Sequence, residues 1–216
     1  MAKKIAVVDY GAGNLTSVSK ALELTGAEVA VTSEGKTIEK ADGVVLPGVG
    51  SFGDAINRLR DLGLVPILED GFRKNKPFLG ICLGFQMLFR ESEEEGRHPG
   101  LNWFRGRVKR FRHGLKIPQV GWNRVRSVKE NPLLAGVPDE SFFYFVHSYY
   151  VDPEEDGIVA ARTDYGGDFV SMIRHGNIFA MQFHPEKSGD LGQLVLRNFY
   201  QLVWSASAES TLPKLV

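Results

Sequence analysis

A short segment near residue 80 places the strongest constraint on how this chain can fold. Residues 78–81 form an apolar run, and residues 83–90 carry a helical pattern directly after it. The sequence between and around them reads Gly80-Ile81-Cys82-Leu83-Gly84. Such an abrupt change from strand to helix leaves room for little but glycine at the two flanking positions. The segment therefore predicts a strand, a sharp turn and a helix at the edge of a parallel sheet.

The first half of the chain repeats this alternation of strand and helix. Short apolar runs alternate with segments in which apolar residues recur at helical spacing. This order is typical of a parallel sheet covered by helices on both faces. We expect strands at 5–8, 28–32, 44–46 and 78–81, and helices at 15–25, 52–62, 64–74 and 83–90.

The second half is richer in strands and ends in a helix. Closely spaced strand-like segments occupy 107–111, 117–120, 142–146, 158–162, 169–174 and 178–183, with a hairpin turn expected at Gly176-Asn177. A helix is expected over 191–204. The predicted fold is α/β: a mixed, mainly parallel sheet flanked by helices, with additional antiparallel strands. We expect one domain over residues 1–204 and a C-terminal tail over 205–216.

Composition excludes several classes of protein. The 216 residues include 26 Lys and Arg against 26 Asp and Glu, so no basic surplus indicates a nucleic-acid partner. A single cysteine cannot form an internal disulfide. No signal peptide or membrane-length apolar run is evident, so we expect a cytoplasmic protein. His98 and His113 have no metal-ligand spacing around them, and we expect neither a metal nor a cofactor.

Cys82 is the candidate nucleophile. A cysteine at the centre of a tight strand–helix turn projects from the edge of the sheet, where a substrate can reach it. The N-terminus of the following helix favours the thiolate, which is the attacking form. A buried structural cysteine is the alternative, but the paired glycines and the strand–helix order favour a nucleophile.

His184 and Glu186 are the candidate base and orienting carboxylate. They lie in the sequence His184-Pro185-Glu186, directly after the expected strand at 178–183. In an extended chain, residues two apart point the same way, so the carboxylate can orient the imidazole towards Cys82. A surface turn is the alternative interpretation of these residues taken alone.

Acyl transfer also needs donors for the developing oxyanion. The Leu83 N–H is one candidate, and the loop Pro47-Gly48-Val49-Gly50 offers a second from Val49, although it also fits an ordinary β–α loop.

An acidic run follows the helix expected over 83–90. We expect it to be the solvated end of that helix; it comprises Glu91, Glu93, Glu94 and Glu95.

With these residues located, the chain resembles the class I glutamine amidotransferases, a flavodoxin-like family, along nearly its whole length. The resemblance rests on residues 80–86 and on His184-Pro185-Glu186. Within the family, the chain is most similar to the glutaminase subunits of imidazole glycerol phosphate synthases, through residues 8–15, 47–53, 118–123 and 145–150. Asn102-Trp103 and the tail after Ser205 depart from the usual pattern, and neither touches the catalytic set.

The resemblance implies a mechanism. Cys82 attacks the carboxamide of glutamine, His184 protonates the departing ammonia and then activates water, and Glu186 orients His184. It also implies that glutamine is held by Gly50, Gln86, His147, Ser148 and Tyr149.

The resemblance further implies a partner. Ammonia would pass to a separate (β/α)8-barrel cyclase subunit in a heterodimer, which makes imidazole glycerol phosphate and AICAR in histidine biosynthesis. Asn14, Trp122 and Lys187 are expected at that interface. We also expect the Val49 N–H to point away from the oxyanion site until the partner and its nucleotide bind.

Three alternatives remain at this point. The chain could serve a different class I amidotransferase, which adding candidate synthases would test. It could be an esterase or peptidase built on the same turn, which activity towards simple esters but not glutamine would indicate. A catalytically silent binding subunit is the third, and the intact set of Cys82, His184 and Glu186 argues against it.

Overall fold

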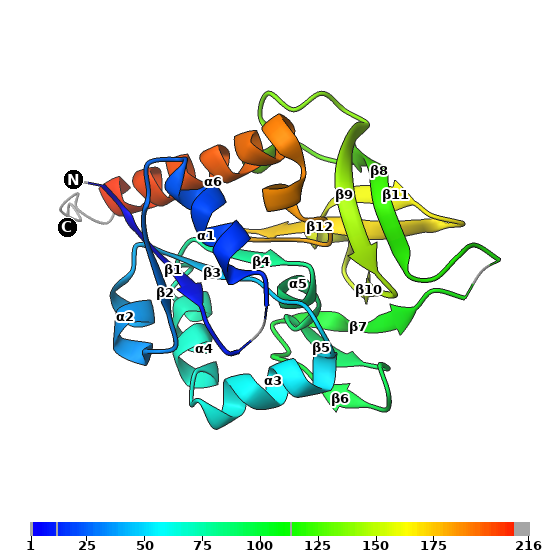
Figure 1. Cartoon of the computed structure of the whole chain (residues 1–216), viewed down its shortest axis with the longest axis horizontal. Coiled ribbons are helices and arrows are strands. Elements are labelled where there is room, and N and C mark those ends of the chain that lie inside the picture. Colours follow the sequence, from blue (N-terminus) through cyan, green and yellow to red (C-terminus); the bar gives the residue numbers. More distant parts are fainter. Residues whose placement is uncertain (1, 12, 113, 210–216) are drawn as a thin grey trace.

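One continuous sheet organises the chain in the computed structural model, which describes residues 2–11, 13–112 and 114–209 (Figure 1). Its main strand order is β2-β1-β3-β4-β13-β12-β10-β7-β5-β6. The first five strands in this order run parallel. They are β2 (Glu28–Thr32), β1 (Lys4–Val8), β3 (Gly43–Leu46), β4 (Phe78–Ile81) and β13 (Ile178–Met181).

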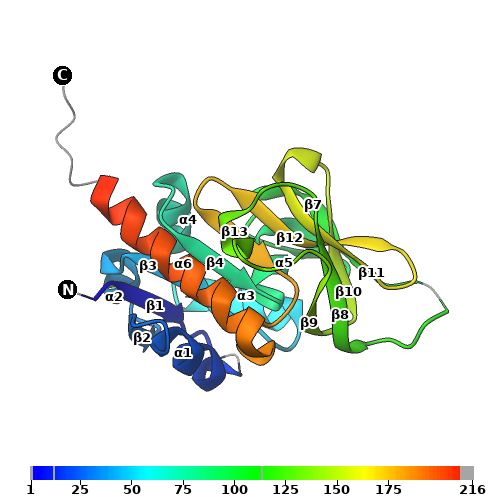
Figure 2. The same ribbon diagram turned by 90° about the horizontal axis from the view of Figure 1, so that it is seen from above.

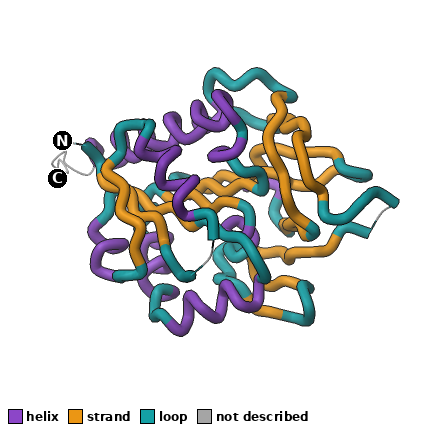
Figure 3. Tube along the Cα trace, viewed as in Figure 1, coloured by secondary structure: helices purple, strands orange, loops and turns teal. Residues whose placement is uncertain are grey.

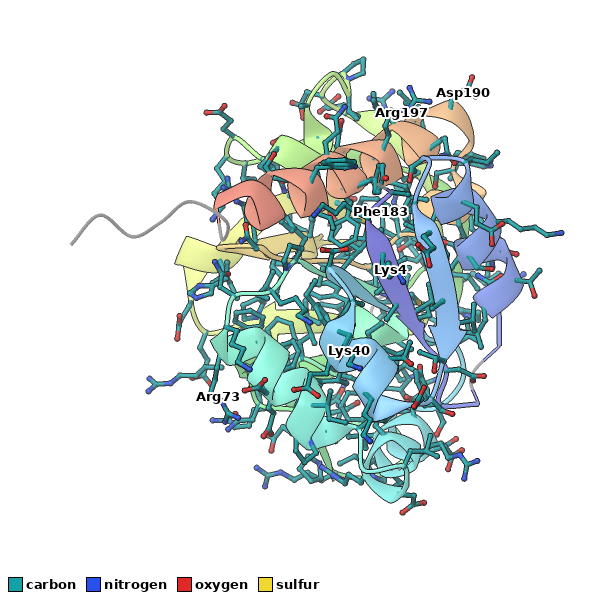
Figure 4. The ribbon with its side chains drawn as sticks, turned by 90° about the vertical axis from the view of Figure 1, so that its left-hand side faces the viewer. Lys4, Lys40, Arg73, Phe183, Asp190 and Arg197 are labelled. Atoms are coloured by element: carbon teal, nitrogen blue, oxygen red, sulfur yellow. The ribbon has the colours of Figure 1, made fainter. Side chains whose placement is uncertain are left out.

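Helices cover both faces of this parallel part. Figure 2 shows α6 along one side, where α1 also lies, and Figure 1 shows α2, α3 and α4 on the opposite side. The bounds are α1 Leu15–Glu23, α2 Gly35–Lys40, α3 Phe52–Asp61, α4 Val65–Arg73 and α6 Gly189–Glu209. In Figure 4, Asp190 and Arg197 mark α6, while Lys40 and Arg73 mark α2 and α4 beyond the sheet.

The alternation of side chains along the strands explains the two layers. In β1, Ile5 and Val7 point into the core shared with α1 and α6, and Ala6 and Val8 point into the core shared with α2, α3 and α4. All four side chains are fully buried. The apolar runs of the sequence therefore correspond to strands with no solvated face, as expected for a parallel sheet.

The other half of the molecule consists mainly of strands (Figure 3). β12 (Asp168–His175) runs antiparallel to β13 across the predicted turn at 176–177. The pair β8 (Gln119–Ser127) and β9 (Ser141–His147) is joined to β12 through β11. The remaining elements are β5 (Phe89–Ser92), β6 (His98–Pro99), β7 (Phe104–Arg110), β10 (Tyr149–Pro153), β11 (Val159–Asp164), α5 (Leu83–Gln86) and the 3-10 turns η1 (Pro132–Leu134), η2 (Asp156–Ile158) and η3 (Pro185–Lys187).

Several boundaries differ from those predicted: β7 begins at Phe104 rather than 107, β8 covers Gln119–Ser127 rather than 117–120, and the short elements α2, β6 and β10 were not predicted. Two further differences bear on the site and on the tail. The helix expected over 83–90 ends at Gln86, and β5 begins at Phe89, because this segment pairs with β7 and its tertiary pairing overrides the local helical pattern. Helix α6 continues to Glu209, past the expected start of the tail at Ser205. The remainder of the tail and His113 lie outside the described residues. Within the described ranges, no helix is both long and apolar enough to cross a membrane.

Candidate active site

Cys82 lies at the turn between β4 and α5 in a strained backbone conformation. Its φ of 54° and ψ of −108° place it in a region that non-glycine residues seldom adopt. The chain can turn this tightly because Gly84 has no side chain: a Cβ there would lie 1.8 Å from the carbonyl oxygen of Leu46. The thiol is consequently held at the carboxyl edge of the parallel strands.

His184 and Glu186 lie at the same edge. β13 runs parallel to β4, and the Cys82 N–H donates to the carbonyl of Met181 at 2.8 Å. His184 follows β13, and its Nδ1 lies 2.8 Å from Oε1 of Glu186. Both side chains are buried, at 2% and 0% exposed. The structure thus brings together the candidate nucleophile, base and carboxylate that the sequence singled out.

The local backbone that achieves this differs from the expected extended chain. Pro185–Lys187 forms the 3-10 turn η3, in which the Lys187 N–H donates to the carbonyl of His184 at 3.1 Å. The Ser188 hydroxyl donates to the same carbonyl at 2.6 Å. Capture of this carbonyl by two donors favours the turn over a continued strand, and the turn brings the carboxylate back to the imidazole.

The two histidines near Cys82 have opposite pKa shifts. Burial lowers the pKa of His184, but the charge and hydrogen bonding of Cys82, followed by Glu186, outweigh burial and raise it to about 10. Burial lowers the pKa of His147 to about 4, against the hydrogen bond to the Tyr149 carbonyl, which raises it. At neutral pH, His184 is therefore a cation beside the sulfur and His147 is a neutral ring.

A cavity of about 260 Å³ opens onto the thiol. Besides Cys82, it is lined by Val49, Gly50, Leu83, Gln86, Glu94, Pro118, Val146, His147, Ser148 and Tyr149. Every residue predicted to bind glutamine or the oxyanion is among them. A larger cavity, of about 490 Å³, lies between η1 and the β8–β9 pair and contains no nucleophile paired with a base.

Glu94 was missed as a site residue. The acidic run was expected to be a solvated helix end, but it follows strand β5, and Glu94 turns into the cavity. Its carboxylate accepts the Phe52 N–H at 2.7 Å, and burial raises its pKa. Because the sequence predicts a helix through residue 90, its periodicity gives no signal for an inward-facing carboxylate at position 94.

Two amides that contact the candidate catalytic residues were also missed. The Asn14 side chain donates to Oε1 of Glu186 at 2.6 Å, although Asn14 was predicted only as an interface residue. The Gln182 amide lies 3.5 Å from the sulfur of Cys82. Its signal was present in the sequence, because Gln182 is the single polar residue in the apolar run 178–183.

The two predicted oxyanion donors do not converge in this structure. The Leu83 N–H donates to the Gly48 carbonyl at 3.4 Å. Because the C=O and N–H of a trans peptide point in opposite directions, the Val49 N–H then points away from the Leu83 N–H. A Cβ on Gly48 would lie 2.4 Å from the Tyr10 hydroxyl, so the loop packs closely at this point.

The fold and this site define a class of protein. The sequence model of the family "Glutamine amidotransferase class-I" matches residues 6–202. The chain belongs to the class I glutamine amidotransferase family. A strained cysteine at a strand–helix turn, next to a buried His–Glu pair, is the feature of this fold that can carry amide hydrolysis.

Closer relatives carry a more specific name. The chain is 48% identical to imidazole glycerol phosphate synthase subunit HisH of Moorella thermoacetica, over 93% of this chain and 96% of the relative. It is 50% identical to the subunit of the same name from Aquifex aeolicus, over 91% and 95%.

Solved structures share the fold at lower identity. A glutamine amidotransferase from Thermotoga maritima aligns with a TM-score of 0.64 at 17% identity, covering 100% of this chain and 88% of that one. The structure of PurLQS from the same organism aligns with a TM-score of 0.74 at 18% identity, covering 96% and 100%.

Proposed function

We propose that this chain is the glutaminase subunit of an imidazole glycerol phosphate synthase in histidine biosynthesis, with the single amidotransferase domain predicted over residues 1–204 extended to the end of α6 at Glu209. The carrying observation is the strained Cys82 beside a buried His184–Glu186 pair, in a chain about half identical to HisH subunits over more than nine-tenths of its length. The reaction is hydrolysis of glutamine to glutamate and ammonia.

The reaction starts from Cys82 paired with protonated His184, the form in which the sulfur can attack and the imidazolium can give up a proton. The sulfur attacks the carboxamide carbon, the C–N bond breaks, and the imidazolium gives its proton to the departing ammonia. The neutral imidazole then takes a proton from water, which attacks the γ-glutamyl thioester. The C–S bond breaks, glutamate leaves and the thiolate is restored, while Glu186 holds the ring by Nδ1 throughout.

The cavity offers complementary groups for glutamine. Gln86 donates its amide N–H groups to protein oxygens, so its own carbonyl oxygen remains as an acceptor for the substrate. Glu94 places a carboxylate where an α-ammonium group can pair with it. Gly50, His147, Ser148 and Tyr149 complete the wall around the substrate.

The oxyanion hole requires one backbone change. Rotation of the peptide between Gly48 and Val49 would withdraw the carbonyl from the Leu83 N–H and bring the Val49 N–H towards it. Loss of one such donor reduces the rate by roughly a hundred- to a thousandfold in other acyl-transfer enzymes. Isolated subunit is therefore expected to hydrolyse glutamine far more slowly than the complex with its partner and nucleotide. Equal rates would contradict this step.

The proposed partner is a (β/α)8-barrel cyclase subunit, which would receive the ammonia and make imidazole glycerol phosphate and AICAR. The β8–β9 pair presents an apolar outer face, with Val120 59%, Trp122 55% and Phe142 49% exposed. Trp122 lies opposite Tyr144, over whose ring the Lys187 ammonium lies at 5.8 Å. The backbone carbonyl of Tyr144 accepts a hydrogen bond from the backbone N–H of His184 at 2.9 Å, so this face adjoins the catalytic residues.

The deciding experiment replaces Cys82 with alanine in a reconstituted synthase. Glutamine-dependent synthesis should be lost, while synthesis from added ammonia should be retained, because the cyclase site is untouched. Pairing the chain with other synthase subunits tests the choice of partner. Retained use of glutamine by the Cys82→Ala complex would disprove the proposed role.

A further inference from the structure

Gln182 is a fully buried glutamine placed directly beside the nucleophile. It follows β13, has no exposed surface, and its Nε2 donates to the Cys82 sulfur at 3.5 Å. Buried amides need partners for both ends, and the partners here are sulfur at one end and Gln86 at the other. No step described above uses this side chain.

The neighbours of Gln182 fix which end of its amide faces the sulfur. Gln86 Nε2 lies 2.9 Å from the backbone carbonyl of Tyr149, which can only accept, so the NH2 group of Gln86 must point there. The same NH2 group reaches Oε1 of Gln182 at 3.0 Å. The Gln182 oxygen is thereby occupied as an acceptor, and its NH2 group is turned towards Cys82.

We propose that Gln182 is a catalytic residue whose amide N–H stabilises the Cys82 thiolate, both before attack and when the thioester breaks. This inference rests on the proposed glutaminase chemistry. A hydrogen bond to a charged acceptor is stronger than one between neutral groups. The interaction therefore favours the thiolate over the thiol, and it does so independently of the partner subunit.

Gln182 differs from the other groups that face the sulfur, because its donor does not titrate. His184 faces Cys82 from the segment after β13, and Tyr10 lies close enough for the sulfur to influence its charge. The Val146 carbonyl lies 3.9 Å from the sulfur on the β9 side. His147 and Glu186 act on the same centre through His184. Of these described side chains, the His184 imidazolium and the Gln182 amide are the two that favour the anion.

Alkylation of Cys82 by iodoacetamide provides a direct test, because the chain has no other cysteine. The sulfur bonds to the methylene carbon and iodide leaves, at a rate that follows the thiolate fraction. In the full-length chain, Gln182→Leu should raise the pH of half-maximal alkylation by about one unit. In the reconstituted synthase, kcat/KM for glutamine should fall about tenfold, with ammonia-dependent synthesis unchanged.

Two further variants keep the test decisive. Gln182→Glu preserves the shape and the acceptor for Gln86 but places a carboxylate against the thiolate, so it should raise the pH of half-maximal alkylation further than Gln182→Leu. Gln193→Leu, which removes a glutamine amide bonded to the Ala21 carbonyl, is the matched control and should leave the profile unchanged.

The outcomes separate the two proposals. An unchanged alkylation profile in folded Gln182→Leu or Gln182→Glu protein would overturn the role of Gln182 alone. If Gln182→Leu does not fold, Gln182→Glu decides by the same criterion. A wild-type profile like that of a free thiol would instead contradict Cys82 as the nucleophile.

Discussion

Asn14 is a residue of the predicted partner surface whose side chain contacts the proposed His184–Glu186 pair directly. It stands at the N-cap of α1 with a left-handed φ of 72°, yet its side chain does not cap the helix. Asparagine at this position usually satisfies a free helix N–H, and losing such a cap costs about 1 kcal/mol. Here the amide instead donates to Glu186. The forgone cap indicates that Asn14 serves to position the carboxylate.

Replacement of Asn14 should therefore impair glutamine hydrolysis in the assembled enzyme. With saturating partner, Asn14→Ala should lower kcat about tenfold, because the carboxylate loses one of its two donors. Asn14→Asp should lower kcat further at neutral pH, since a second carboxylate then faces Glu186. The exposed Asn57→Ala on α3 is the control. A change in partner affinity with kcat intact would indicate an interface role only.

His147 should make the stability of the fold depend on acid pH. Its pKa is about 4 when folded and about 6.5 in a model peptide, so the unfolded chain binds the extra proton first as pH falls. The free energy of unfolding should consequently decrease between pH 6.5 and 4, by up to about 3 kcal/mol from this group. The free energy of unfolding, measured by urea denaturation at several pH values across this range, should depend less steeply on pH in His147→Phe than in the wild type. The exposed His175→Gln should keep the wild-type slope.

At the scale of elements, the β4–α5 turn depends on the absence of a side chain at Gly84. A methyl group there would overlap the Leu46 carbonyl of β3, which belongs to the sheet itself and cannot move aside cheaply. Gly84→Ala should lower the free energy of unfolding by about 3 kcal/mol. Gly157→Ala, whose new Cβ would meet nothing within 4 Å, should change it by less than about 0.5 kcal/mol. Similar unfolding midpoints for the two variants would contradict this interpretation.

The same turn shows how far the sequence can predict this fold. Local patterns predict β4, the turn and the start of α5, because the spacing of apolar residues and the paired glycines determine the backbone over only a few residues. The end of α5 does not, since Phe89 is drawn into a strand by β7, a partner more than ten residues away. Glu94 was missed for the same reason: whether a carboxylate faces solvent or a cavity depends on where the pairing places it.

The candidate catalytic residues could be singled out in the sequence to the extent that they carry recognisable neighbours. Cys82 lies between two glycines, and His184 and Glu186 frame a proline. Asn14 is brought to Glu186 only by the packing of α1 against η3, across a separation of 172 residues. Contacts of this kind arise from the tertiary fold, so spacing along the chain gives no indication of them.

At the scale of the whole molecule, two exposed tryptophans lie at opposite ends. Trp122 is on β8, and Trp204 is near the end of α6, beneath the Lys3 ammonium. Figure 1 shows β8 and the C-terminal end of α6 at opposite ends of the molecule. They are 55% and 44% exposed, so each could anchor a partner by surface alone. Only Trp122 lies on a strand next to β9, whose Tyr144 carbonyl binds the His184 N–H. A partner that docks on Trp122 could therefore influence the active site through β9, the strand between the two.

Trp122→Ala should therefore weaken assembly with the barrel subunit by about 2 kcal/mol, or roughly thirtyfold in Kd, as expected for a central interface tryptophan. Trp204→Ala should leave Kd unchanged, and both variants should unfold near the wild-type midpoint because both tryptophans lie at the surface, about half exposed. Titration calorimetry measures the affinities. At saturating partner, the Trp122→Ala complex should also hydrolyse glutamine more slowly, because the contact that the substitution removes lies next to His184. Equal affinities for the two variants would place the partner on another surface.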